Sequence, residues 1–308
     1  PAVNIIAIAR RERELVMQRL FSQSSQLLIL LYSLLCSHPV TAEIGPATPS
    51  SELEQITVTA SRLPVISQRT GSAVSIISKE DIQQLSPLTV SELFRRVPGL
   101  SVSQVGPAGS LTQIRIRGAE ANQILVMIDG IEANDVSQGS EFNFAHLMPN
   151  QIERIEIVRG PQSAIWGSDS LAGVIHIITK QGKAEPSSLL QLGAGSQGLQ
   201  QFNVASNLNI DQTNFALGLE SVRNQGENAS RSGPEDDGYR NTTLSAMLQS
   251  QFADNYQVKA SLRSTRSETE YDDIDYATTG LPMDAEFRSE SIQNYAGVTL
   301  SHTNNNLI

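Results

Sequence analysis

Two acidic clusters combine residue types and spacing that could bind a cation. They occupy residues 234–239 and 271–276. Calcium takes several carboxylate and carbonyl oxygens at flexible spacing, and Gly238 permits the sharp turn that such a loop needs. Charge runs are often only solvated, so acidic loops that attract ions diffusely are the alternative. The candidate calcium ligands are Glu235, Asp237 and Asp272, with Asp236 and Asp273 as neighbouring candidates.

The chain shows no set of side chains that is typical of an active site. Cys36 is the only cysteine, which excludes a disulfide or a cysteine-rich metal site within the chain. The four histidines never form a two-ligand spacing, and no nucleophile with a base stands out. Residues 193–198 match G-x-G-x-x-G, but the next residues have period two and not the helix that a dinucleotide site requires. We therefore expect no enzyme and no covalent cofactor.

Charge and composition narrow the class of protein further. The 308 residues carry a net charge of −10, which argues against nucleic acid as a partner because phosphate neutralisation needs clustered Lys and Arg. Only 18% of the residues are charged, a composition common in large antiparallel β proteins. After the first fifty positions no apolar run approaches the ~20 residues of a membrane-spanning helix.

The N-terminal residues are typical of a targeting sequence. Residues 17–42 have a positive start, a compact apolar run and small residues at the exit, which predicts a secretory signal peptide. Residues 1–16 fit poorly before such a signal, and we expect them to be an upstream gene-model artefact. Residues 43–62 should form a linker whose first part, rich in Pro, Gly, Ser and Thr, is flexible.

A short strand is predicted inside this linker, at residues 54–60. It alternates apolar and polar side chains and contains successive β-branched residues. A lone short strand cannot hold itself together in water, so it needs a sheet edge in its own domain or in a partner. Its residues are Glu54, Gln55, Ile56, Thr57, Val58, Thr59 and Ala60.

Residues 63–182 predict a small α+β domain. Short helices are expected after Ser78, which can cap a helix, and at residues 89–96. The run at 124–128 is apolar throughout, as expected for a strand covered on both faces. The expected strands are 74–77, 113–118, 124–128, 151–161 and 174–179.

Residues 187–308 alternate apolar and polar side chains in six stretches, as transmembrane β-barrel strands do. The connections at 211–212 and 253–255 are short, whereas those at 224–238 and 265–290 are long. Periplasmic turns and extracellular loops alternate in this way in outer-membrane barrels. A soluble sandwich is the alternative, and its core should contain more aromatic residues. Plugged barrels use about 22 strands, so we expect the barrel to be truncated.

The segment 63–182 resembles the plug of TonB-dependent outer-membrane receptors. The phrases ELFRRVPGLSV, IRIRG, VMIDG and IERIEIVRGPQSAIWGSDSLAGVIHIITK occur in the family's order and cover the segment. The resemblance implies a plug domain followed by the first antiparallel strands of a barrel in outer-membrane lipid. It also implies a receptor that imports a scarce nutrient. The 54–60 strand then resembles a TonB box, which faces the periplasm and pairs with the energy transducer TonB.

Several strands of the plug-like segment alternate charged and aliphatic residues. Inside a polar barrel lumen, these charges would find partners on the barrel wall, and a solvated sheet face is the alternative. The charged residues are Arg115, Arg117, Glu153, Arg154, Glu156 and Arg159.

Within this family, the resemblance implies cobalamin (vitamin B12) as the ligand. The phrases GAEANQILVMIDGIEAND and GPQSAIWGSDSLAG are most similar to those of cobalamin receptors. Such receptors have calcium-binding acidic loops in the places of the two clusters, although this chain has Glu235 where Asp is typical. A ferric-siderophore receptor is the alternative within the family. A passive porin-like channel is the alternative outside it, but porins lack a plug and a coupling strand.

Two polar stretches of the plug-like segment, 101–110 and 132–144, are expected to be loops that face the outside. They are rich in Gly, Ser, Asn and Gln, which make adaptable polar contacts with a ligand. The expected ligand-contacting residues are Gln104, Ser110, Asn134, Ser137 and Gln138.

Overall fold

The computed structural model describes residues 57–58, 65–66, 72–180, 186–228, 230, 235–253, 255–274 and 277–302. The upstream stretch, the expected signal peptide and the ends of the 54–60 strand lie outside these residues. Strand β1, Thr57–Val58, pairs antiparallel with β2, Val65–Ile66. The described part of the short strand is thus extended, and the sheet edge that it uses belongs to its own chain.

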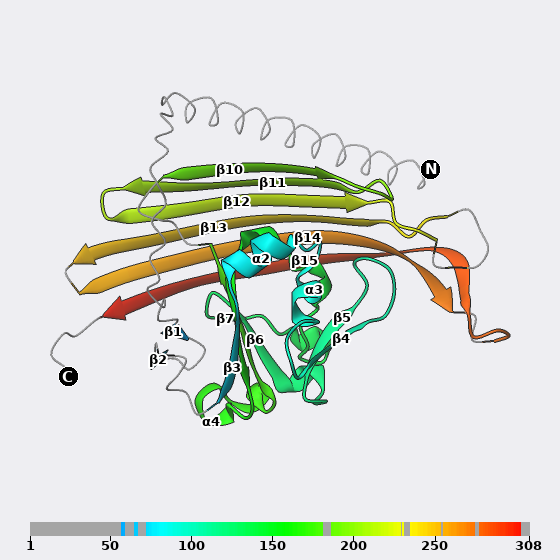
Figure 1. Ribbon diagram of the computed structural model, residues 1–308, viewed down its shortest axis with the longest axis horizontal. Helices are drawn as coiled ribbons and strands as arrows, with labels where there is room; N and C mark the ends of the chain where they lie inside the picture. Colours follow the sequence, from blue (N-terminus) through cyan, green and yellow to red (C-terminus); the bar gives the residue numbers. More distant parts are fainter. Residues whose placement is uncertain are drawn as a thin grey trace, which may run out of the picture. The chain divides into compact units, whose positions relative to one another are not determined.

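Residues 72–180, called the plug domain here, are built around a five-stranded sheet in the order β3-β8-β9-β6-β7 (Figure 1). β6 and β9 pair in parallel, and the other neighbours pair antiparallel. Every residue of β6 and β9 is buried, as the apolar run at 124–128 predicts. The strands are β3 Ala73–Ile77, β6 Ile124–Ile128, β7 Ile131–Glu132, β8 Ile152–Arg159 and β9 Gly173–Thr179.

Two short helices, α2 (Lys79–Leu85) and α3 (Val90–Phe94), begin near the residues that the sequence predicts. Before α2, Ser78 Oγ accepts from Asp81 N, while Ser78 N donates to Asp81 Oδ2. This capping box satisfies two backbone donors at the start of the helix. The shorter elements are α4 Ser163–Trp166, η2 Ala121–Gln123, η3 Val136–Gln138, η4 Phe144–His146, η5 Pro149–Gln151 and η6 Ser168–Ser170. Among the described residues, no helix combines the length and hydrophobicity that crossing a membrane requires.

The plug domain has a hydrophobic core of its own. Ile155, Ile157 and Ile175 from its central strands are fully buried, and they pack with Phe94 of α3. Burying a side chain of this size stabilises a fold by about 1.5–3 kcal/mol. This core fixes the position of the loops that leave the plug sheet.

A second, two-stranded sheet corrects one of the expected loops. β4, Leu100–Gln104, pairs antiparallel with β5, Thr112–Ile116, so residues 101–104 of the polar stretch 101–110 form a strand. Only residues 105–111 connect the two strands. The strand escapes sequence analysis because just two of its residues, Leu100 and Val102, pack against the core.

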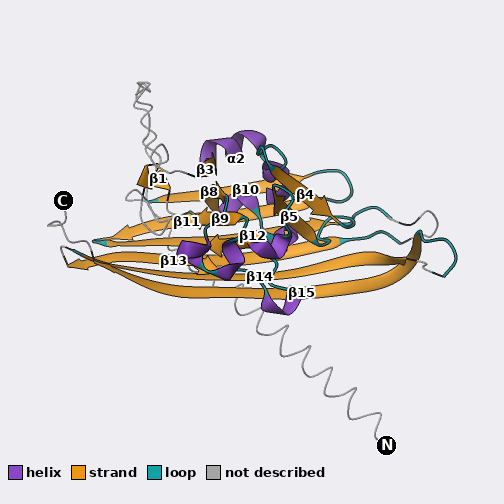
Figure 2. Cartoon of the chain, turned by 90° about the horizontal axis from the view of Figure 1, so that it is seen from below, coloured by secondary structure: helices purple, strands orange, loops and turns teal. Residues whose placement is uncertain are grey.

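Strands β10 to β15, called the wall here, form a six-stranded antiparallel sheet in sequential order (Figures 1 and 2). The six expected stretches are therefore confirmed as strands, and the short turn at 211–212 is confirmed as well. The strands are β10 Ser187–Ala194, β11 Gln200–Ile210, β12 Thr213–Asn224, β13 Tyr239–Ala253, β14 Tyr256–Ile274 and β15 Pro282–His302.

β14 and β15 are longer than the sequence predicts. The connection expected at 265–290 is mostly strand, paired from Thr265 opposite Gln293 to Ile274 opposite Pro282, with a register shift after Tyr271. Only residues 275–281 separate the two strands. Hydrophobic alternation stops in this stretch because polar and charged residues occupy both faces, whereas backbone pairing continues.

One face of the wall contacts the plug domain, and the other carries exposed apolar side chains. On the inner face, Tyr295 OH donates to Ala133 O at 3.4 Å. Further contacts are Asn150 Nδ2 to Glu220 Oε1 at 2.6 Å, Gln151 Nε2 to Asn203 Oδ1 at 2.8 Å and Lys259 Nζ to Asp129 Oδ1 at 3.7 Å. The exposed apolar residues of the outer face include Leu192, Leu217, Leu244, Leu262, Val298 and Leu300. Polar-in and apolar-out is the arrangement that the alternation predicts.

The partners described for the charged side chains on the plug strands lie within the plug domain. The contacts are Lys79–Glu153 at 3.4 Å, Arg115–Glu120 at 3.3 Å, Arg154–Glu156 at 2.9 Å and Arg159 Nη2 to Ser75 Oγ at 2.8 Å.

Candidate functional site

The two acidic clusters of the sequence meet in the structure. One carboxylate oxygen from each of Glu235, Asp237 and Asp272 lies within 4.8 Å of the other two. Glu235 and Asp237 precede β13, and Asp272 lies near the end of β14. Asp237 is fully buried, while Glu235 and Asp272 are half-buried. Three carboxylates so close together repel one another unless a cation or protons offset their charge.

Backbone hydrogen bonds hold the two segments of this acidic cluster together. Glu270 N donates to Gly238 O at 2.8 Å, and Gly238 N donates to Glu270 Oε2 at 3.2 Å. On the other side of Asp272, its Oδ1 accepts from Ala285 N of β15 at 3.1 Å. The carboxylates are thus fixed by strand ends and not by mobile side chains alone.

A third segment, at Gly226, approaches the cluster so closely that a side chain would not fit. A Cβ on Gly226 would lie 1.9 Å from Asp237 O, and the residue has a φ of +79°, which L-residues rarely adopt. Asp237 N donates to Glu227 O at 3.4 Å. The segment that follows β12 therefore braces the backbone of Asp237.

The acidic cluster has the donor set and spacing that a calcium ion needs. Calcium binds oxygens at 2.3–2.6 Å, so oxygens around one ion lie within about 5 Å of one another. Asp272 Oδ2 is buried and has no hydrogen-bond partner among the described residues, as expected of a ligand atom. The structure brings the three main candidate ligands together, whereas the neighbouring candidates Asp236 and Asp273 are exposed and outside the cluster.

The β4–β5 loop of the plug domain lies against the wall beside the acidic cluster. Thr269 Oγ1 donates to Gly109 O at 3.3 Å, and Thr269 stands opposite Tyr239, two residues after Asp237. The Gln104 amide donates to Gly106 O and Pro107 O within this loop. Ser110 follows Gly109 in this loop, whereas Gln104 ends β4 at the start of the loop.

The predicted contacts at 132–144 are placed differently. Asn134 accepts from Val126 N at 2.7 Å and donates to Ile124 O and Ser140 O. A ligand contact from this amide would compete with these three bonds. Ser137 Oγ donates to Asp135 Oδ1 at 2.7 Å, and Gln138 is exposed at the end of the same turn.

His146 and Tyr239 join the plug domain to the wall in a way that the sequence did not indicate. Tyr239 OH donates to Ala145 O at 3.1 Å, so it accepts from His146 Nδ1 at 3.2 Å. Asn143 Nδ2 lies 3.4 Å from His146 Nε2, and its oxygen is occupied by backbone N–H groups, including that of Ala145. The network therefore fits a neutral ring that accepts at Nε2. Burial lowers the pKa of His146 to about 4.

We expect acid to weaken this junction. The unfolded chain takes up a proton on His146 near the usual pKa of 6.5, whereas the folded chain resists protonation down to about pH 4. A lowered pKa in the folded state gives stability that is present above pH 6.5 and lost as the pH falls towards 4, about 3 kcal/mol for this group. Thermal unfolding measured between pH 7 and pH 4 should show the loss. His146→Gln should make it shallower, and an equally steep loss in that variant would contradict the assignment.

A family model matches the plug domain, and two curated relatives match a longer part of the chain. Residues 67–174 match the family model of the TonB-dependent Receptor Plug Domain. The chain is similar to the Vitamin B12 transporter BtuB of Vibrio vulnificus (strain CMCP6), with 33% identity over 225 residues. That alignment covers 71% of this chain and 36% of the relative. The Vitamin B12 transporter BtuB of Vibrio cholerae serotype O1 (strain M66-2) is 36% identical over 203 residues, covering 65% of this chain and 32% of the relative. The chain thus spans about a third of the length of these curated relatives.

Solved structures share the same fold. The ferripyoverdine receptor of the outer membrane of Pseudomonas aeruginosa has a TM-score of 0.64 at 14% identity, over 80% of this chain and 34% of that chain. At this identity the likeness concerns the fold alone. The siderophore receptor PirA from Acinetobacter baumannii has a TM-score of 0.53 at 25% identity, over 67% of this chain and 33% of that chain.

Proposed function

Since this chain belongs to the TonB-dependent receptors of the bacterial outer membrane, we propose that it binds cobalamin outside the cell and imports it with energy delivered by TonB. The observation that supports this ligand is the similarity to two vitamin B12 transporters, which extends beyond the plug domain to about 225 residues. The strands of the wall are therefore included in the similarity.

A ferric siderophore is the second candidate ligand. The siderophore receptor PirA, at 25% identity over 67% of this chain, favours it. The identity to the vitamin B12 transporters is higher, at 33–36%, and for this reason we place cobalamin first. The passive porin alternative requires a channel without a plug, and the described plug domain contradicts it.

Calcium is the cation that we propose for the acidic cluster. Its role would be to order the segment before β13 and the end of β14, next to the plug loop with Gln104 and Ser110. A rim that is ordered in advance lowers the entropy cost of binding a ligand. Ser137, Gln138 and Asn134 remain proposed contacts on the second polar stretch.

TonB is the partner that we propose for residues 54–60. An extended segment can bind by adding a strand to a sheet edge of its partner. The pairing of β1 with β2 supports this reading, because it shows that Thr57 and Val58 adopt a conformation ready for strand addition. A pairing of two residues is too short to be stable alone, so β1 can leave β2 at small cost.

Deletion of the gene tests the proposed ligand. We expect the mutant to lose growth that depends on added cobalamin and to lose uptake of labelled cyanocobalamin. Growth on a chelated ferric siderophore as the iron source should be unchanged, and the intact gene should restore cobalamin uptake. The opposite pattern, with iron uptake lost and cobalamin uptake retained, would replace cobalamin by a siderophore.

A further inference from the structure

The pairing register of the wall defines which side chains point away from the plug domain. On β14, Lys259 and Thr269 reach plug residues, so residues of odd number face inward. On β12, Val222 and Asn224 are buried, and on β13 Tyr239 and Asn241 are buried. Arg223 and Arg240, which lie between these buried positions, are exposed on the outer face.

Arg223 of β12 stands directly opposite Arg240 of β13. Side chains in such positions have Cβ atoms about 5 Å apart, and like charges there are destabilising. Among the described residues, neither arginine has a hydrogen bond or an ion pair with another side chain. Glu268, the anion that stands opposite Arg240 on β14, is itself paired with Arg288, so the pair is a concentration of positive charge that is only partly offset.

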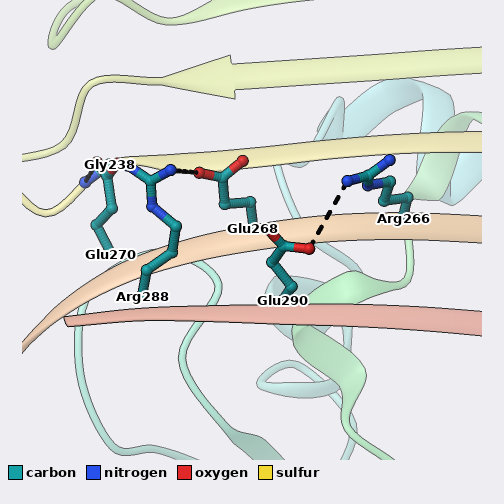
Figure 3. Close-up of polar contacts among 6 residues, drawn as sticks. All are labelled: Gly238, Arg266, Glu268, Glu270, Arg288 and Glu290. Atoms are coloured by element: carbon teal, nitrogen blue, oxygen red, sulfur yellow. Dashed lines mark hydrogen bonds and ion pairs between the residues drawn. The ribbon is translucent and has the colours of Figure 1, made fainter. Parts of the chain in front are cut away.

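The neighbouring arginines on the same face are all paired. Figure 3 shows Arg288 of β15 beside Glu268, at 2.7 Å, and close to Glu270, at 2.9 Å. Arg266 of β14 forms an ion pair with Glu290 at 3.7 Å. Glutamates thus neutralise Arg266 and Arg288 on this face, but no ion pair is described for Arg223 or Arg240. Arg223 and Arg240 are called the positive patch.

The position of this patch along the strands matches the edge of the apolar band. The last outward apolar residues before the patch are Leu219 of β12 and Leu244 of β13, each four residues from the arginine on its strand. Four residues span roughly 14 Å along the strand at ~3.4 Å per residue, or about 10 Å along the membrane normal for a strand tilted by ~40°. The two guanidinium groups therefore lie just beyond the apolar band, at the level of lipid headgroups.

A shallow apolar groove runs on the outer face below the patch. Small residues, including Ala246, Ala260 and Ala296, line it between the larger side chains of Leu217 and Leu262, and its volume is about 480 Å³. The patch and the groove thus combine a site for an anionic headgroup with a site for acyl chains. The long connection between β12 and β13 places the patch on the extracellular side.

We propose that Arg223 and Arg240 together bind the phosphate of a phosphorylated outer-leaflet lipid whose acyl chains lie on the groove. Guanidinium groups bind phosphate oxygens by paired, charge-assisted hydrogen bonds, which explains two arginines at one position. The site lies outside the lumen, so it is separate from the transported ligand and from the acidic cluster.

The test measures lipid binding to the full-length receptor in detergent by native mass spectrometry. The probes are bis-phosphorylated lipid A, the same lipid without its phosphates, and inorganic phosphate. The variants are R223Q/R240Q, the charge-preserving R223K/R240K, and the control R266Q, which removes an arginine that is already paired on the same face.

We expect unmodified receptor to retain the phosphorylated lipid and R223Q/R240Q to lose at least about tenfold in retention. R223K/R240K should keep most of the binding, and R266Q should behave as the unmodified protein. Equal loss in R266Q, equal retention of the lipid without phosphates, or equal binding of inorganic phosphate would each overturn the proposal. The test does not measure cobalamin uptake. Failure of the lipid proposal can therefore be distinguished from failure of the proposed function.

Discussion

We expect Val58→Pro and Ile56→Pro to abolish energy-dependent uptake while ligand binding to the receptor is unchanged. Proline fixes φ and removes the backbone N–H, so either substitution deletes a donor that strand addition to TonB needs. Val58 is in β1, and Ile56 lies outside the described residues. The ligand contacts are proposed on the plug loops and not on residues 54–60.

Two controls separate coupling from other effects of proline. Val58→Ala shortens the same side chain but keeps the N–H, so uptake should persist. Val65→Pro disturbs the β1–β2 pairing from the other strand, since Val65 stands opposite Val58, and it leaves residues 54–60 intact. Uptake should persist in this variant too, because strand addition to TonB would in any case require β1 to leave β2.

Uptake of labelled ligand by energised cells and binding to isolated outer membranes are the two measurements. Normal uptake in Val58→Pro would remove residues 54–60 from the coupling role. If Val65→Pro also abolished uptake, the β1–β2 hairpin itself, and not strand addition to a partner, would be the functional unit.

The strands that sequence analysis identified either alternate apolar and polar side chains or are apolar along their whole length. β6 and β9 were found because nearly all of their residues are apolar. β11 to β13 were found because apolar side chains on their outer faces alternate with polar side chains on their inner faces. β4 was missed because serine occupies its exposed positions. The extension of β14 beyond Thr265 was missed because it rises past the apolar band, where selection for hydrophobic side chains ends while hydrogen bonding continues.

The three carboxylates that converge are those that the sequence predicted. The acidic clusters on loops at one side of the wall identified Glu235, Asp237 and Asp272, and the register of β13 on β14 brings them together. Asp236 and Asp273 alternate with the converging residues and so point elsewhere. The junction of His146 with Tyr239 joins residues 93 positions apart, a distance over which no local pattern of sequence carries information.

Removal of calcium should lower the affinity of the full-length receptor for cobalamin roughly ten- to hundredfold, because the rim of the site must then be ordered during binding. The three convergent carboxylates repel one another without a cation, and Asp237 is fully buried among them. With the ion present, the same charges hold the β12–β13 connection to the end of β14. Titration of cyanocobalamin with calcium and with a chelator measures the difference.

Neighbouring aspartates outside the acidic cluster allow matched control variants for this cation site. Asp237→Asn and Asp272→Asn keep the side-chain shape but remove one charge each from the acidic cluster, and we expect calcium affinity to fall at least about tenfold. Asp236→Asn and Asp273→Asn remove the same charge from exposed positions beside the cluster, and they should leave calcium affinity nearly unchanged. Calcium titration without cobalamin measures this directly, so the result does not depend on the identity of the ligand.

A glycine substitution can perturb the site without removing any carboxylate. In Gly226→Ala the new Cβ would meet Asp237 O, so the backbone of Asp237 must shift and calcium affinity should fall as in Asp237→Asn. Gly280→Ala is the control, since Gly280 also has a positive φ, of +65°, but no atom within 4 Å of the added Cβ. Equal calcium affinity in Gly226→Ala and Gly280→Ala, together with equal effects of Asp237→Asn and Asp236→Asn, would leave diffuse attraction of ions by solvated loops as the explanation.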